Sequence, residues 1–184
     1  MSAITLFPNW TITRTAGFAA YSIASFGCAV IWLWARAGLR RSAELARLAL
    51  VLSVVELLFA LDMIFEWRLA LHTSLAGLFT AHHMYDRRYP FQLWSLVALA
   101  LILLTFLTYF FRHYRGRPGA RIALTGVSLS LSLWLIEIIS MHSVDHSLYH
   151  VVNNIMVVAI LWISLCVLTL AGVGIEAQRA ARKA

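Results

Sequence analysis

Histidine and carboxylate side chains gather in one short segment of the chain. His142, His146 and His150 recur every four residues, and Asp145 lies between them. On a helix this spacing places the three imidazoles along one face over about 12 Å, so only two neighbouring histidines can share one metal ion. Imidazole with carboxylate suits zinc, iron, copper or manganese, and Asp145 could alternatively orient a ligating histidine.

A metal or haem site here needs further ligands, and the adjacent pair His82 and His83 can supply them. If a turn falls within residues 142–150 instead, the four-residue spacing no longer aligns the imidazoles. Interfacial histidines that bind no ligand are the remaining interpretation. The candidate ligands for a transition metal or haem are His82, His83, His142, Asp145, His146 and His150.

Two acids lie within apolar stretches, where a charge is costly. Glu56 and Glu137 are each flanked by long runs of hydrophobic residues. On insertion scales an acid at the centre of a membrane helix costs about 2.5–3.5 kcal/mol, so such a residue indicates either a functional group or a hydrogen-bonded structural one. A proton or ion path through Glu56, Asp62 and Glu137 is a weaker interpretation, because no inverted repeat or broken helix is visible.

The composition shows which kind of element must position these residues. Of 184 residues, 61% are hydrophobic and 12% are charged, with a mean hydropathy of +0.80. A soluble domain has roughly 25% charged and about 45–50% apolar residues. The sequence therefore predicts an all-α integral membrane protein with a single membrane domain, residues 1–184. A secreted disulfide scaffold, a cytosolic enzyme and a disordered tail are excluded.

Five stretches are long and apolar enough to cross a membrane, which takes about 20 residues. They cover residues 16–35, 45–65, 91–111, 122–140 and 151–172. Residues 66–89 are too polar to cross, yet Trp67, Leu71, Leu75 and Leu78 recur at helical spacing. This pattern predicts an amphipathic helix lying at the outer membrane interface, between the second and third spans.

The basic residues predict the orientation. Eleven of the fifteen fall on one side of the five spans and four on the other. By the positive-inside rule, the N-terminus lies outside and the C-terminus in the cytoplasm of a bacterial inner membrane. The net charge of +7 is thus a topology signal, and no nucleic-acid partner is expected. Lys183 is the only lysine, so no lysine within the membrane can form a Schiff base.

Three short elements carry a resemblance to a family. They are Trp67-Arg68, then Tyr85-Asp86-Arg87-Arg88 with Gln92, and then Ser140-Met141-His142-Ser143-Val144-Asp145. In these elements the central part of the chain resembles a family of uncharacterised small polytopic bacterial membrane proteins. The resemblance implies a shared fold and a shared outer-face cluster, and it implies no particular activity.

Two functions follow as expectations. Little of the chain lies outside the spans, and Ala16, Ala20, Ala24 and Cys28 place small residues at four-residue spacing, which lets helices approach closely. These features favour an accessory or structural subunit of a larger membrane complex of redox or photosynthetic type, in contact with membrane lipids and other membrane-protein subunits. The alternative is a metal- or haem-binding membrane redox enzyme whose site lies at the outer surface.

Overall fold

The computed structural model describes residues 11–37, 42–81, 88–139, 142–152 and 155–183. Seven helices occur in these ranges: α1 (Ile12–Ala37), α2 (Ala43–Phe65), α3 (Trp67–Ala81), α4 (Arg88–His113), α5 (Pro118–Ile139), α6 (His142–Leu148) and α7 (Val157–Lys183). The strands β1 (Val151–Val152) and β2 (Ile155–Met156) pair in an antiparallel manner. Helices α1, α2, α4, α5 and α7 are long and apolar enough to cross a membrane, which confirms an all-α, multi-pass membrane protein.

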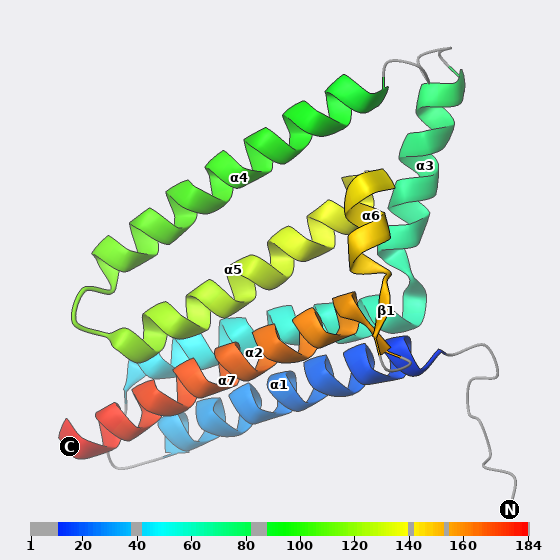
Figure 1. Ribbon diagram of the computed structural model, residues 1–184. Helices are drawn as coiled ribbons and strands as arrows, with labels where there is room; N and C mark the ends of the chain where they lie inside the picture. The colour runs from blue at the N-terminus through cyan, green and yellow to red at the C-terminus, as the bar shows by residue number, and fades with distance from the viewer. Residues whose placement is uncertain (1–10, 38–41, 82–87, 140–141, 153–154, 184) are drawn as a thin grey trace, which may run out of the picture.

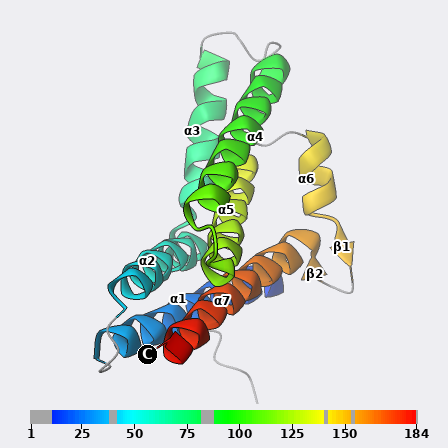
Figure 2. The same ribbon diagram turned by 90° about the vertical axis from the view of Figure 1, so that its left-hand side faces the viewer.

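Four of these helices form a bundle, and the fifth lies at its edge. Helix α1 packs along α2, α5 packs along α7, and α7 also contacts α1. Helix α4 packs mainly against α5 and stands apart from α1, α2 and α7 (Figures 1 and 2). Helix α3 runs across the ends of the other helices at the end of the bundle where α1 begins (Figure 1).

Local signals explain where the helices begin and end. The Ser42 hydroxyl accepts a hydrogen bond from the backbone N–H of Leu45 at 3.2 Å, which caps the start of α2. Glu66 ends α2 in a left-handed conformation with φ 55°, and α3 begins at the next residue. Gly116, with φ 84°, turns the chain between α4 and α5. Pro118 then occupies the first turn of α5, where no backbone donor is needed.

The seam between α5 and α7 depends on glycine. A Cβ atom added at Gly172 would lie 2.3 Å from the backbone nitrogen of Ala123 and 2.7 Å from the carbonyl oxygen of Gly119. A Cβ at Gly126 would lie 2.6 Å from Thr169 Oγ1. Since lipid is as apolar as leucine, helices in a membrane associate through close packing of this kind.

The small residues of α1 face the chain's own bundle. Ala24 and Cys28 are fully buried, and Ala16 and Ala20 pack against the core around Tyr21. The expected close approach therefore occurs within the chain, between α1 and its neighbours.

The last span begins later than expected. Residues 151–152 and 155–156 form a small hairpin, so α7 starts at Val157 and extends to Lys183 instead of covering residues 151–172. Val151, Val152 and Ile155 are β-branched and flank two asparagines, a composition that favours a hairpin over a helix start. At the other end the polar residues after Gly172 continue the helix. Within residues 66–89, where an amphipathic interfacial helix is expected, helix α3 covers Trp67–Ala81 and α4 begins at Arg88.

Candidate functional site

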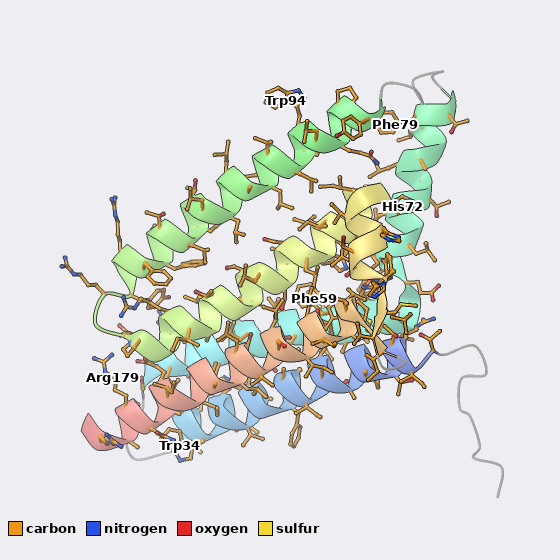
Figure 3. The ribbon with its side chains drawn as sticks, viewed as in Figure 1. Trp34, Phe59, His72, Phe79, Trp94 and Arg179 are labelled. Carbon is orange, nitrogen blue, oxygen red and sulfur yellow. The ribbon has the colours of Figure 1, made fainter. Side chains whose placement is uncertain are left out.

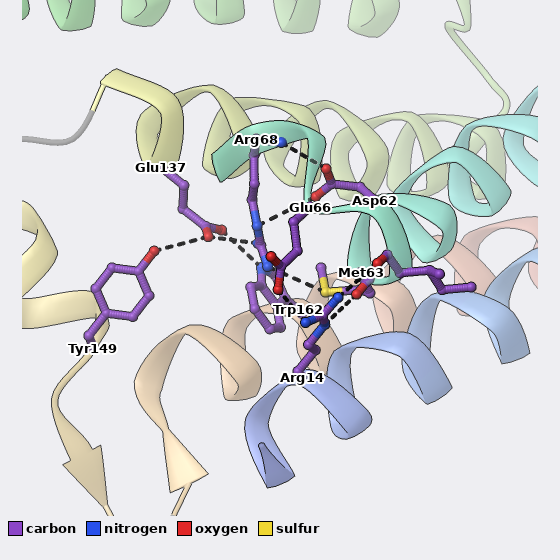
Figure 4. Close-up of polar contacts among 9 residues, drawn as sticks. Arg14, Asp62, Met63, Glu66, Arg68, Glu137, Tyr149 and Trp162 are labelled. Carbon is purple, nitrogen blue, oxygen red and sulfur yellow. Dashed lines mark hydrogen bonds and ion pairs between the residues drawn. The ribbon is translucent and has the colours of Figure 1, made fainter. Parts of the chain in front are cut away.

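Charged side chains meet inside the protein at the end of the bundle covered by α3. We call this group the ionic centre: Asp62 of α2, Arg68 of α3, Glu137 of α5, Tyr149 after α6 and Trp162 of α7 (Figure 4). The side chains of Asp62 and Glu137 are 1% and 2% exposed, and that of Arg68 is 17% exposed. Intramembrane ionisable groups of this kind face the interior and pair with one another.

Asp62 fixes Arg68 in two ways. One carboxylate oxygen, Oδ1, accepts a hydrogen bond from the backbone N–H of Arg68 at 3.0 Å. The other, Oδ2, lies 3.5 Å from the guanidinium Nε. Because Arg68 lies in the first turn of α3, where backbone donors lack partners within the helix, Asp62 caps α3 as well as pairing with the arginine.

Glu137 accepts from three different segments. Arg68 Nη1 donates to Oε2 at 2.7 Å, the Tyr149 hydroxyl donates to the same oxygen at 3.3 Å, and Trp162 Nε1 donates to Oε1 at 3.2 Å. The guanidinium also lies over the Trp162 ring, 4.7 Å from its centroid, which is a cation–π contact. Figure 4 shows Glu137 between Tyr149 on one side and Arg68 on the other.

Arg14 clamps the corner between α2 and α3. Its guanidinium forms an ion pair with Glu66 and donates to the carbonyl oxygens of Met63 and, at 2.8 Å, Ile64. These carbonyls belong to the last turn of α2, where no helical donor remains for them. The N-terminal turn of α1 is thereby attached to the left-handed corner at Glu66.

The end of α5 is capped by side chains from α3 and α4. His72 Nδ1 lies 3.1 Å from the carbonyl oxygen of Ile138, and Gln92 Nε2 donates to that of Ile139 at 3.0 Å. A carbonyl only accepts, so Nδ1 of His72 carries the proton in this contact. Arg68 and Gln92 belong to two of the three elements of the family resemblance. Both side chains bind the last turn of α5, which directly precedes the third element of the resemblance, residues 140–145.

Both acids expected to be buried are buried, in different surroundings. Glu137 belongs to the ionic centre, whereas Glu56 lies midway along α2 and is 0% exposed. Cys166 Sγ lies 3.7 Å from Glu56 Oε2, and Oε1 has no hydrogen-bond partner among the described residues. Glu56 therefore has fewer and weaker described hydrogen-bond partners than Glu137.

The histidine segment is helical only in part. Helix α6 ends at Leu148, so His150 lies beyond it and the three histidines do not share one continuous helix. His146 and His150 are exposed. The backbone carbonyl of His150 accepts from the N–H of Val157 at 3.0 Å, which attaches this segment to the start of α7.

The remaining candidate ligands cannot be placed with these two. His82 and His83 lie outside the described residues, as do the side chains of His142 and Asp145. Among the side chains that the structure does describe, no three histidine, cysteine, aspartate or glutamate residues are arranged to hold a metal ion.

The sequence did not reveal the partners of Glu137. The sequence patterns indicated no partner for Glu137 at Arg68, Tyr149 or Trp162. The available signal was electrostatic: acids within spans need a cation, and the basic residues near the spans at that end are Arg14, Arg68, Arg87 and Arg88. Arg68 has the better geometry because it directly follows the span that contains Asp62.

The members of the ionic centre pair mainly with one another, and only Asp62 Oδ2 among their described carboxylate oxygens accepts no hydrogen bond, although it lies 3.5 Å from Arg68 Nε. The oxygens of Glu137 accept three hydrogen bonds, and the Arg68 guanidinium is shared between two carboxylates and a ring. Together these contacts clamp five segments of the chain: α2, α3, α5, the residues after α6, and α7. Comparisons of the chain with protein-family models, curated proteins and solved structures find no match.

Proposed function

We propose that the protein is an integral membrane accessory subunit that packs against a larger membrane complex, of redox or photosynthetic type, through α4. The observation that carries the proposal is the isolation of this helix. It is long and apolar enough to span a membrane, yet none of its described residues is buried. The other four spanning helices each bury a quarter or more of their most apolar segment.

One face of α4 is suited to contact another protein. We call it the α4 outer face and define it by Trp94, Ala98, Leu101 and Thr105, which are all exposed and recur at helical spacing. Trp94 is 70% exposed and points away from the bundle (Figure 3). Small residues and hydroxyls favour helix association in a membrane, and Ala98 and Thr105 provide them at the centre of this face.

The distribution of charge between the two ends of the bundle supports the predicted orientation in the membrane. At the end of the bundle where α4 meets α5, the described side chains include two acids and eight arginines: Glu44, Glu176, Arg36, Arg47, Arg112, Arg115, Arg117, Arg121, Arg179 and Arg182. At the other end Arg14 and Arg68 are neutralised by three acids. This asymmetry favours a cytoplasmic C-terminus and an N-terminus outside the bacterial inner membrane.

Helix α3 directs Arg68 and His72 toward the bundle, while its hydroxyl residues Thr73, Ser74 and Thr80 are exposed. Arg68 and His72 bind the end of α5, while Leu71 and Leu78 remain 46% and 57% exposed. In water this arrangement would be unfavourable. It is favourable where the outward face meets acyl chains and headgroups, so it supports a place for α3 at the outer membrane interface.

Native purification tests the subunit role. The protein, isolated in mild detergent from its source membrane, should bring a larger complex with it, identified by mass spectrometry and by an absorption spectrum. Ala98→Phe with Thr105→Phe should abolish this co-purification. The matched control is Ala19→Phe with Ala171→Phe, two exposed alanines on α1 and α7. Both variants should unfold thermally like the unaltered protein, and equal co-purification of both would contradict the proposal.

A metal- or haem-binding redox enzyme with an outer-surface site is the second candidate. The observation in its favour is that α6 is helical from His142 to Leu148, the condition that a His142/His146 ligand pair requires. His150, His82 and His83 would add ligands, with Asp145 as a ligand or as an orienting partner. Elemental analysis of the purified protein tests this role: stoichiometric iron, copper or zinc supports it, and metal-free protein with intact histidines contradicts it.

A further inference from the structure

A hollow at the turn between α4 and α5 is lined largely by arginine. Its volume is about 480 Å³, and its walls are Leu107, Thr108, Phe111, Arg112, Arg115 and Arg121. Arg112 lies in the last turn of α4, Arg115 in the turn itself, and Arg121 in the first turns of α5. Long side chains ending in nitrogen gather around this turn in Figure 3.

These three arginines have no acidic partner among the described residues. Glu44 and Glu176, the acids at this end of the bundle, both bind Arg117 instead, Glu176 at 2.8 Å. The Arg121 guanidinium lies over the Phe111 ring, 5.4 Å from the ring centroid. No described carboxylate forms an ion pair with this guanidinium. Three guanidinium groups around one hollow therefore attract an anion, and their planar donors match a phosphate group.

The floor of the hollow is apolar and continues into the span. Leu107 lies one turn before Phe111 on α4, and Phe111 is 47% exposed. Because the arginines occupy the ends of two spanning helices, a bound molecule would meet charge at the membrane surface and hydrocarbon-like side chains beneath it. Basic pockets between spanning helices commonly hold anionic headgroups in this way.

We propose that this hollow binds the phosphate headgroup of an anionic phospholipid, with an acyl chain lying along Leu107 and Phe111. The assignment rests on charge and shape at this turn and is independent of the subunit role. Neutralising the arginines would remove the attraction for the headgroup and leave the apolar floor unchanged.

Lipid binding to the purified full-length protein tests the proposal. Phosphatidylglycerol or phosphatidylcholine is titrated into detergent micelles, and bound lipid is counted by native mass spectrometry. The unaltered protein should retain phosphatidylglycerol in preference to phosphatidylcholine. Arg112→Gln with Arg115→Gln and Arg121→Gln should lose the preference, with affinity falling about fivefold for each arginine removed.

The matched control removes the same charge elsewhere at this end of the bundle. Arg36→Gln with Arg47→Gln and Arg182→Gln should keep the preference for phosphatidylglycerol. An equal loss of the preference in both triple variants would mean that the summed positive charge at this end of the bundle attracts the lipid, and it would overturn the proposal. A lack of preference for phosphatidylglycerol in the unaltered protein would overturn it as well. Displacement of the lipid by inorganic phosphate at similar concentration would identify a soluble anion as the occupant. Should the triple variant fail to fold, Arg115→Gln alone, in the exposed turn, should still weaken binding about fivefold.

Discussion

Arg68 Nη1 lies 2.7 Å from Glu137 Oε2, and this ion pair joins the first turn of α3 to the last turn of α5 across 69 residues of sequence. Both side chains are largely removed from solvent. An ion pair in such surroundings is costly to form from hydrated ions, but far more costly to break by removing one partner. The pair therefore fixes how α3 lies on the bundle.

Removing one member of this pair should destabilise the protein. Glu137→Gln leaves Arg68 with Asp62 alone and should lower the free energy of unfolding by about 3 kcal/mol, measured by denaturant unfolding in micelles. Arg68→Met together with Glu137→Gln should cost less than the sum of the two single changes, because Asp62 is then the only carboxylate of the ionic centre left without its cation. Glu44→Gln, at an ion pair whose acid is 75% exposed, should change stability by less than about 1 kcal/mol. Equal effects at Glu137 and Glu44 would contradict the clamp.

The glycine seam should tolerate no added methyl group at Gly172. Gly172→Ala places Cβ against the backbone of α5, which must move, and should cost about 1–3 kcal/mol. Gly174→Ala, two residues away on the same helix and facing open space, should be neutral or stabilising by up to about 1 kcal/mol. Thermal unfolding of both variants in one detergent measures the difference. Similar melting temperatures would refute the close approach.

The orientation predicts opposite labelling of two positions. A cysteine at His146 should react with an impermeant thiol reagent added outside intact cells, whereas a cysteine at His113 should react only after the membrane is opened. Cys28 and Cys166 are buried and should contribute little background. Labelling of both positions from the same side would overturn the proposed sidedness.

The histidine–carboxylate segment should matter more than the cytoplasmic histidine. Replacing His142 and Asp145 together with alanine should impair assembly or activity more than His113→Ala. His113 stacks on Tyr109 at the end of α4 and has no predicted ligand role. Yield of the assembled complex and metal content serve as readouts. Equal tolerance of both changes would remove this segment from the candidate sites.

The spans were predictable because their signal is local. Five apolar stretches of membrane length follow from composition alone, and the structure has five such helices. The hairpin before α7 was missed because Val151, Val152 and Ile155 add as much hydropathy as helical residues do. Only their β-branching beside two asparagines marks the difference.

The buried acids were also predictable, whereas their partners were not. A carboxylate in an apolar run is visible at Glu56 and Glu137 without any fold. The pairing of Glu137 with Arg68 depends on the left-handed corner at Glu66, which directs α3 across the bundle. Four arginines lie near the spans at that end, and hydropathy alone does not tell that Arg14 reaches Glu66 while Arg68 reaches Glu137.

The position of α7 has a consequence for biogenesis. This helix is translated after α2 and α5, and it carries both Trp162, which donates to Glu137, and Cys166, which lies beside Glu56. Until α7 is inserted, Glu56 lacks its contact with Cys166, and Glu137 has Arg68 but lacks the hydrogen bond from Trp162. A premature stop codon before Val157 would yield a chain that membrane quality control degrades, and no partly working product is expected.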